Sequence, residues 1–269
     1  LLKSMALDKN CIDTTTFNVL QPAIDYYIEH GSPDEQLRTY YYKGRIYQNQ
    51  GNNDLAMQSF MRGKEFCQEA SDTLTMANLM VAQATIQYRI YKIDDFIKNN
   101  LEAANLYSSI GRTDYELLSL ANALDGGILN NDKSLSDSVW NIAKQRVSEN
   151  PDLGSIIVPY ELSYALKFGN KEDVIGILNH RESVDSINDM VKLNVAEAYY
   201  KIGDVRNAKR VLDAIPIKSK FRSSLKYLAL KPEILELNGD LAGALHAYKD
   251  FHTTIDSIHM GIFSHDLLF

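Results

Sequence analysis

The stretch LRTYYYKGRIYQNQGNNDLAMQSFMRGKEFCQEA, residues 37–70, decides the fold class of this chain. It contains two helical patterns separated by a polar turn at 51–54. In each pattern small and aromatic residues recur at intervals of four and three, which places them on one face of a helix with about 3.6 residues per turn. These residues are Tyr40, Gly44 and Tyr47 before the turn, and Ala56, Phe60 and Gly63 after it. The stretch therefore predicts a helical hairpin in which small residues allow close approach and aromatic rings fill the space beside them.

The same pattern recurs along the chain. Turn glycines at Gly169, Gly203 and Gly239 lie 34 and 36 residues apart. In the second helix of a hairpin, a small residue falls at the same distance after the turn glycine, as at Ala56, Ala208 and Ala244. A fixed period of this length is typical of stacked helical hairpins, in which each hairpin buries its apolar faces against its neighbours.

This pattern resembles the tetratricopeptide repeat (TPR) family, which has a period of 34 residues. The match is good at 37–70 and 189–216, fair at 226–251 and weak elsewhere, with Lys92 in place of a turn glycine and Trp140 in a large-residue position. The resemblance implies an all-α fold, a right-handed superhelix of about 12–13 helices in a single solenoid domain over 1–269. The expected units are 1–33 (partial), 37–70, 78–111, 112–150, 155–188, 189–222 and 225–258, followed by a helical tail, 259–269.

Composition narrows the functional classes. The chain has 269 residues, of which 45% are hydrophobic and 23% charged, as in ordinary globular proteins. With 28 basic and 35 acidic residues its net charge is −7, which argues against a nucleic-acid-binding surface. No apolar run approaches the length of a membrane span. We expect the apolar end, Leu267–Phe269, to continue as a helix in the natural chain.

The sequence lacks the common catalytic and cofactor motifs. It has no glycine-rich phosphate loop and no nucleophile elbow. Cys11 and Cys67 lack metal-binding or redox spacing and are expected to be small buried residues, although a disulfide stays open. His252, Asp256 and His259 share a helix face, which a solvent-exposed terminal helix explains more simply than a metal site. We expect no enzymatic activity, no metal and no cofactor.

The repeat offsets also predict which side chains face inward. By the resemblance, first helices line a concave groove that suits a protein or peptide ligand. Tyr41 has two interpretations, either in this groove beside Arg45 or packed on the neighbouring helix. The predicted partner-binding residues are Arg38, Tyr41, Arg45, Gln48, Arg89, Glu197, Tyr200, Lys201, Glu233 and Glu236, together with the apolar Ala82, Ile86 and Leu193.

The leading functional prediction is a non-enzymatic protein–protein or peptide-binding domain. The alternative is a small-ligand or glycan-binding protein that uses Tyr41 and Tyr200 as stacking platforms. The sequence is also similar to bacterial multi-repeat proteins that carry such a domain outside the cytoplasmic membrane as the sensing half of a regulator. That similarity favours an extracytoplasmic location, in a larger regulatory or membrane-anchored protein.

Overall fold

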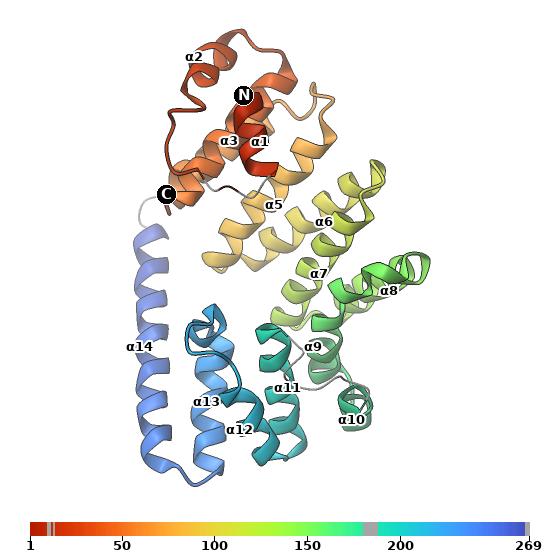
Figure 1. Ribbon diagram of the computed structural model, residues 1–269, viewed down its shortest axis with the longest axis vertical. Coiled ribbons are helices and arrows are strands. Elements are labelled where there is room, and N and C mark those ends of the chain that lie inside the picture. Colours follow the sequence, from red (N-terminus) through yellow and green to blue (C-terminus); the bar gives the residue numbers. More distant parts are fainter. Residues whose placement is uncertain (10–11, 13, 180–187, 267–269) are drawn as a thin grey trace. The chain divides into compact units, whose positions relative to one another are not determined.

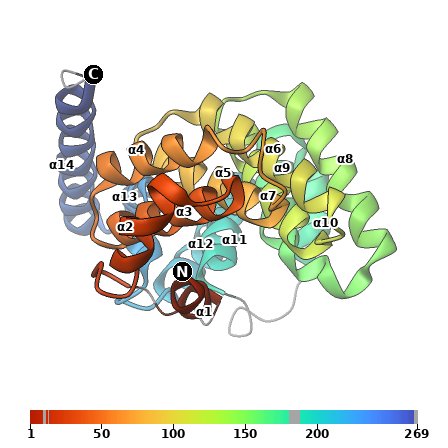
Figure 2. The same ribbon diagram turned by 90° about the horizontal axis from the view of Figure 1, so that it is seen from above.

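The computed structural model describes residues 1–9, 12, 14–179 and 188–266, and the described part is all-helical, as predicted (Figure 1). It divides into two compact units, unit 1 (Leu1–Ile157) and unit 2 (Val158–Phe269). Within each unit, most helices that follow one another in the sequence pack against each other (Figure 2).

Unit 1 has a regular spacing of helices. The helices α3 to α8 begin at every twentieth residue, so a full hairpin repeats every 40 residues instead of the expected 34. The bounds in unit 1 are α1 (Leu2–Lys9), α2 (Gln21–His30), α3 (Pro33–Asn49), α4 (Asn53–Lys64), α5 (Thr73–Arg89), α6 (Ile93–Ser109), α7 (Thr113–Leu129), α8 (Lys133–Glu149) and the short 3-10 helix η1 (Pro151–Ile156).

Unit 2 has shorter helices and a different spacing. The helices α11 and α13 begin 36 residues apart, and so do α12 and α14. The bounds are α9 (Val158–Phe168), α10 (Lys171–Asn179), α11 (Asp189–Ile202), α12 (Val205–Asp213), the 3-10 helix η3 (Lys220–Ser223), α13 (Leu225–Leu237) and α14 (Leu241–Asp266). Contacts join α11 to α12, α11 to α13, and α13 to α14.

Local sequence signals explain where the helices begin and end. Ser32 caps α3 through a capping box with Glu35, and Pro33 follows in the first turn. Gly51 adopts φ +78°, which glycine tolerates best, and so closes α3. The cap of α4 is Asn52, whose side chain accepts from the Leu55 N–H, so that Asn53 and Asp54 are the first two residues of the helix.

One turn prediction in unit 1 needs correction. The left-handed residue between α5 and α6 is Tyr91, at φ +59°, and Lys92 comes after it as the N-cap position. Asp94 lies within the first turn of α6 and accepts a hydrogen bond of 2.6 Å from the side chain of Asn130. Asp94 therefore joins two successive hairpins.

The small and large residues of the second helices lie where the pattern predicts. Ala56, Ala208 and Ala244 are each the fourth residue of their helix, and each is at most 3% exposed. Phe60 of α4 is fully buried against Gly44 of α3. This confirms the predicted alignment of hairpins at these positions.

Hydrogen bonds between hairpins connect residues about one repeat apart. Asp34, at the start of α3, accepts bonds from the Ser71 hydroxyl (2.8 Å), the Ser71 N–H (2.6 Å) and the Asp72 N–H (3.0 Å). Asp72 in turn forms an ion pair with Arg38 and caps α5. The Ser71 hydroxyl bond, followed by the two backbone bonds, lowers the pKa of Asp34 against the opposing effect of its partial burial.

Asp34→Asn is expected to destabilise the protein by about 1–2 kcal/mol at pH 7, because the bonds to a charged acceptor are weakened. A pKa lowered by folding adds stability above the unfolded-state value and loses it as pH falls through the folded-state value. The difference between wild type and variant should therefore be constant from pH 7 to about 5 and shrink as pH falls further. Urea denaturation across this range measures it. Glu69→Gln, at an exposed carboxylate of the same unit, is the control and should change stability by no more than about 0.5 kcal/mol at pH 7.

Candidate functional site

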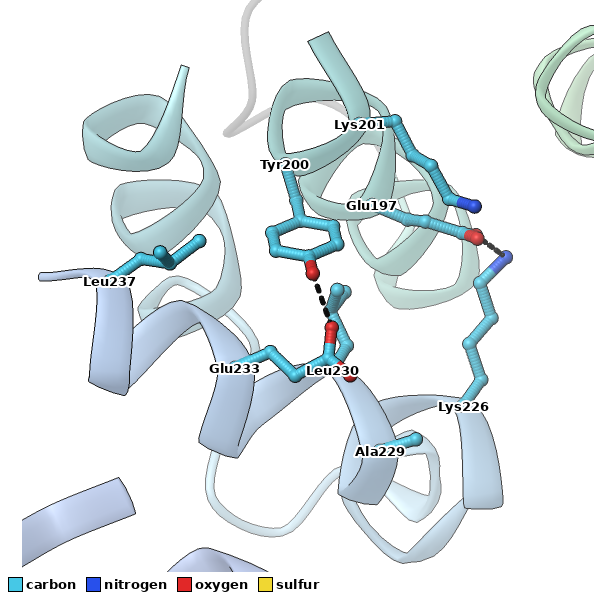
Figure 3. A pocket seen from close by; sticks show the side chains of 8 residues that line it. All are labelled: Glu197, Tyr200, Lys201, Lys226, Ala229, Leu230, Glu233 and Leu237. Atoms are coloured by element: carbon cyan, nitrogen blue, oxygen red, sulfur yellow. Dashed lines mark hydrogen bonds and ion pairs between the residues drawn. The ribbon is translucent and has the colours of Figure 1, made fainter. Parts of the chain in front are cut away.

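An open hollow in unit 2 brings four of the predicted inward-facing residues together. It has a volume of about 590 Å³ and lies between α11 and α13, which the sequence predicts as the first helices of successive hairpins (Figure 3). Its lining residues are Glu197, Tyr200, Lys201, Lys226, Ala229, Leu230, Glu233 and Leu237. Glu197, Tyr200, Lys201 and Glu233 belong to the predicted set.

Helical periodicity places these side chains on the hollow. On α11, Glu197, Tyr200 and Lys201 follow one another at intervals of three and one, so they project from one side of the helix. Ala196 and Ala198, on the two flanks of this polar side, are both fully buried. Asn188 holds the start of the helix by accepting from the Val191 N–H at 3.0 Å. The buried alanines and the cap together fix α11 and direct its polar side toward α13.

Two polar contacts span the hollow. The Tyr200 hydroxyl donates to the Glu233 carboxylate, and Lys226 forms an ion pair of 2.5 Å with Glu197 (Figure 3). The bond to Glu233, and secondarily partial desolvation, raise the pKa of Tyr200 to about 12. Tyr200 is therefore a neutral hydrogen-bond donor at physiological pH. Each contact joins α11 to α13 directly.

A second tyrosine–glutamate bond lies beside the hollow. Glu236, another predicted residue, accepts a bond of 3.0 Å from the Tyr248 hydroxyl of α14. This bond is the first cause of a raised pKa of Tyr248, to which Glu233 also contributes, and Tyr248 contributes to the raised pKa of Tyr200. The two pairs therefore interact electrostatically at the end of the hollow formed by the later part of α13.

The predicted residues of unit 1 have other roles. Arg38 pairs with Asp72, and Tyr41 is 5% exposed in the core, so the interpretation in which it packs on neighbouring helices is confirmed. Arg45 donates to the side chain of Gln48 at 2.8 Å, and Gln48 is buried with its amide donating to the Ala82 carbonyl at 3.3 Å. Ala82, Ile86 and Leu193 are also buried, whereas Arg89 is exposed at the end of α5.

Four lining residues were missed from the sequence, although their signal was present. All four lie on α13 together with Glu233. Lys226, Ala229 and Leu230 come seven, four and three positions before Glu233, and Leu237 comes four positions after it. Those intervals place them on the helix face of Glu233, so applying the helical period to that one residue would have identified them.

Unit 1 has a second open hollow, of about 540 Å³, between α3 and α4. None of its lining residues belongs to the predicted partner-binding set; they are Tyr40, Lys43, Tyr47, Leu55, Gln58, Ser59, Met61, Arg62 and Glu65.

The cysteines and the possible metal ligands form a separate set of candidates. Cys67 is a free, partly buried thiol whose pKa is raised by burial, and Cys11 lies outside the described residues. Within the described part, His, Cys, Asp and Glu side chains form no group of three suited to a metal ion. No described helix is both long and apolar enough to cross a membrane.

No protein-family model matches the sequence, and no curated protein matches it at a significant level.

Proposed function

We propose that this chain is a TPR-type repeat protein that binds a peptide segment of a partner, without catalysis, in the hollow between α11 and α13. One observation carries the proposal: Glu197, Tyr200, Lys201 and Glu233, chosen from repeat offsets alone, line the same hollow. A groove between first helices of successive hairpins suits an extended chain, since polar side chains along it can bond to peptide groups. The right-handed superhelical arrangement of hairpins is part of this proposal.

The composition of the hollow supports a peptide as ligand. Interfaces for peptides combine apolar surface with polar groups that fix orientation. Ala229, Leu230 and Leu237 provide the apolar surface, and Tyr200 is an aromatic side chain with a polar end, a type enriched at binding hot spots. The hollow is open to solvent, as the binding of an extended segment requires.

A substitution that fills the hollow tests the proposal. Ala229→Arg places a large side chain in it, and peptides selected from a random library on the wild-type chain should bind this variant at least about tenfold more weakly. Ala242→Arg is the matched control, because Ala242 is an exposed helical alanine that does not line the hollow. Fluorescence anisotropy measures affinity, and thermal unfolding verifies that both variants fold.

Three outcomes would contradict the proposal. They are a library that yields no binding peptide, selected peptides that bind Ala229→Arg as well as wild type, and a loss of binding that is equal in Ala242→Arg. Selective binding of glycans or other small molecules in the hollow, with no peptide selected, would favour the alternative of a small-ligand protein.

A further inference from the structure

The hollow of unit 2 has oppositely charged ends. One end carries Lys201 and the Glu197–Lys226 ion pair, and the other carries Glu233 bonded to Tyr200 (Figure 3). In the close-up, the Lys201 amine lies on the side of the Glu197–Lys226 pair and away from the Tyr200–Glu233 bond. A ligand that crosses the hollow therefore meets a cationic end and an anionic end.

Internal pairing leaves charge available at each end. Lys226 is engaged, by Glu197 at 2.5 Å and by the side-chain oxygen of Asn194 at 2.7 Å. Lys201 is exposed, and no described carboxylate pairs with it. The cationic end thus has two positive charges against one negative charge, with the Lys201 ammonium open to a ligand.

At the other end the charge is negative. Glu233 is exposed, and its partner among the described residues is the neutral hydroxyl of Tyr200. Glu236, one turn further along α13, is bonded by the neutral hydroxyl of Tyr248. Neither tyrosine neutralises a carboxylate, so a cationic side chain of a ligand would be attracted to this end and could also pack on the Tyr200 ring.

The positions of residues along α13 give the distance between the two charged ends of the hollow. Ala229 and Leu230 lie between the two ends on α13. Lys226, which marks the cationic end on this helix, lies seven positions before Glu233, a rise of about 10 Å at 1.5 Å per residue. A peptide in the polyproline II conformation repeats its side-chain direction every three residues, over about 9 Å.

We propose that the hollow binds an extended segment with a basic side chain against Glu233, an acidic side chain against Lys201, and small or apolar residues between them. The preferred spacing is three positions, because it directs both charged side chains to the same face of the segment at the separation of the two ends. This inference rests on the proposed function and specifies the chemistry of its ligand.

Charge reversal on both molecules tests the inference. Three synthetic peptides that differ only at two positions, three apart, carry Lys and Glu, Lys and Lys, or Glu and Glu. Wild type should bind the mixed peptide about fivefold more tightly than either of the others, as expected for exposed ion pairs near 1 kcal/mol. Lys201→Glu should shift the preference to the Lys–Lys peptide, and Glu233→Lys to the Glu–Glu peptide.

The variants are suited to this experiment because both side chains are exposed, and thermal unfolding checks that each variant folds. The preference of wild type for the mixed peptide should also weaken as salt is raised. The same ranking of peptides in wild type and both variants would overturn the inference. If the peptides still lose binding to Ala229→Arg in that case, the proposed function stands and only the charge preference is wrong; if none binds in the hollow, the proposed function fails first.

Discussion

Phe60→Ala is expected to destabilise unit 1 by about 3–5 kcal/mol, the usual cost of deleting a fully buried phenylalanine from a core. Phe60 has no exposed surface, and its ring packs against Gly44 of the facing helix and near the ring of Tyr41. The loss combines the removed apolar contacts with the cavity left between α3 and α4, which neighbouring helices cannot fill without moving.

The matching substitution on the other helix should also be unfavourable. A Cβ at Gly44 would lie 2.3 Å from the Phe60 ring, far inside normal contact distance. Gly44→Ala is therefore expected to cost about 1–3 kcal/mol as overpacking, even though alanine favours a helix by about 1 kcal/mol over glycine. In a Phe60→Leu background the cost of Gly44→Ala should fall, because the flexible leucine can move away from the added methyl group.

Urea denaturation of the single and double variants measures this coupling. Gly176→Ala, a helical glycine of α10 with open space around its added Cβ, is the control and should leave stability unchanged or raise it. Additive effects of Gly44→Ala and Phe60→Leu, or a stabilising effect of Gly44→Ala alone, would show that the two residues do not share one packing constraint.

The pairing of a small residue with a large one explains which hairpins could be predicted from the sequence. In the hairpin of α3 and α4 a small residue, Gly44, faces a large one, Phe60, at the positions that the repeat pattern predicts. In such a hairpin the sequence alone locates both helices and their contact. In the hairpin of α5 and α6 the sizes are exchanged: Phe96 is the fourth residue of α6, where Ala56 stands in α4, and Asn100 is the eighth, where Phe60 stands. Both are buried. The small-then-large pattern of α4 is therefore absent from α6, so the sequence match was weak there.

The spacing of unit 1 was missed for a related reason. Its turns use left-handed Gly51, Tyr91, Gly111 and Asn131, and only two of these are glycines. Asparagine tolerates that conformation, but tyrosine rarely adopts it, so Tyr91 carries no local signal of a turn. Without it, the 20-residue interval between helix starts is difficult to recognise from the sequence.

The candidate site could be predicted from the sequence where its residues lie together on a single helix face. Glu197, Tyr200 and Lys201 follow from the repeat offsets of α11. In contrast, Arg38 and Gln48 contact residues 34 positions later, Asp72 and Ala82. A single helix face does not reveal whether the next hairpin covers it, so residues that join hairpins and residues that face a groove give the same sequence pattern.

An ion pair with a buried carboxylate in unit 1 gives the second large prediction. Glu116 of α7 is 5% exposed and accepts a bond of 2.8 Å from Arg146 of α8. Arg146 also contacts Glu149 at 3.2 Å and the Ser108 hydroxyl of α6 at 3.5 Å, so one guanidinium connects three successive helices. The bond to Glu116 is the first cause of a raised pKa of Arg146, which remains charged throughout the physiological range.

Arg146→Ala is expected to destabilise the protein by about 3–5 kcal/mol, since it leaves the Glu116 carboxylate buried without its cation. The cause can be separated from lost packing by adding Glu116→Gln, which removes the charge and keeps the shape of the side chain. The double variant should then be more stable than Arg146→Ala alone, although Glu116→Gln by itself destabilises wild type. Chemical denaturation of the four proteins gives the coupling free energy directly. If Glu116→Gln instead lowers stability equally with and without Arg146, then α7 and α8 are held together by their apolar contacts, and the ion pair contributes little to the stability of this hairpin.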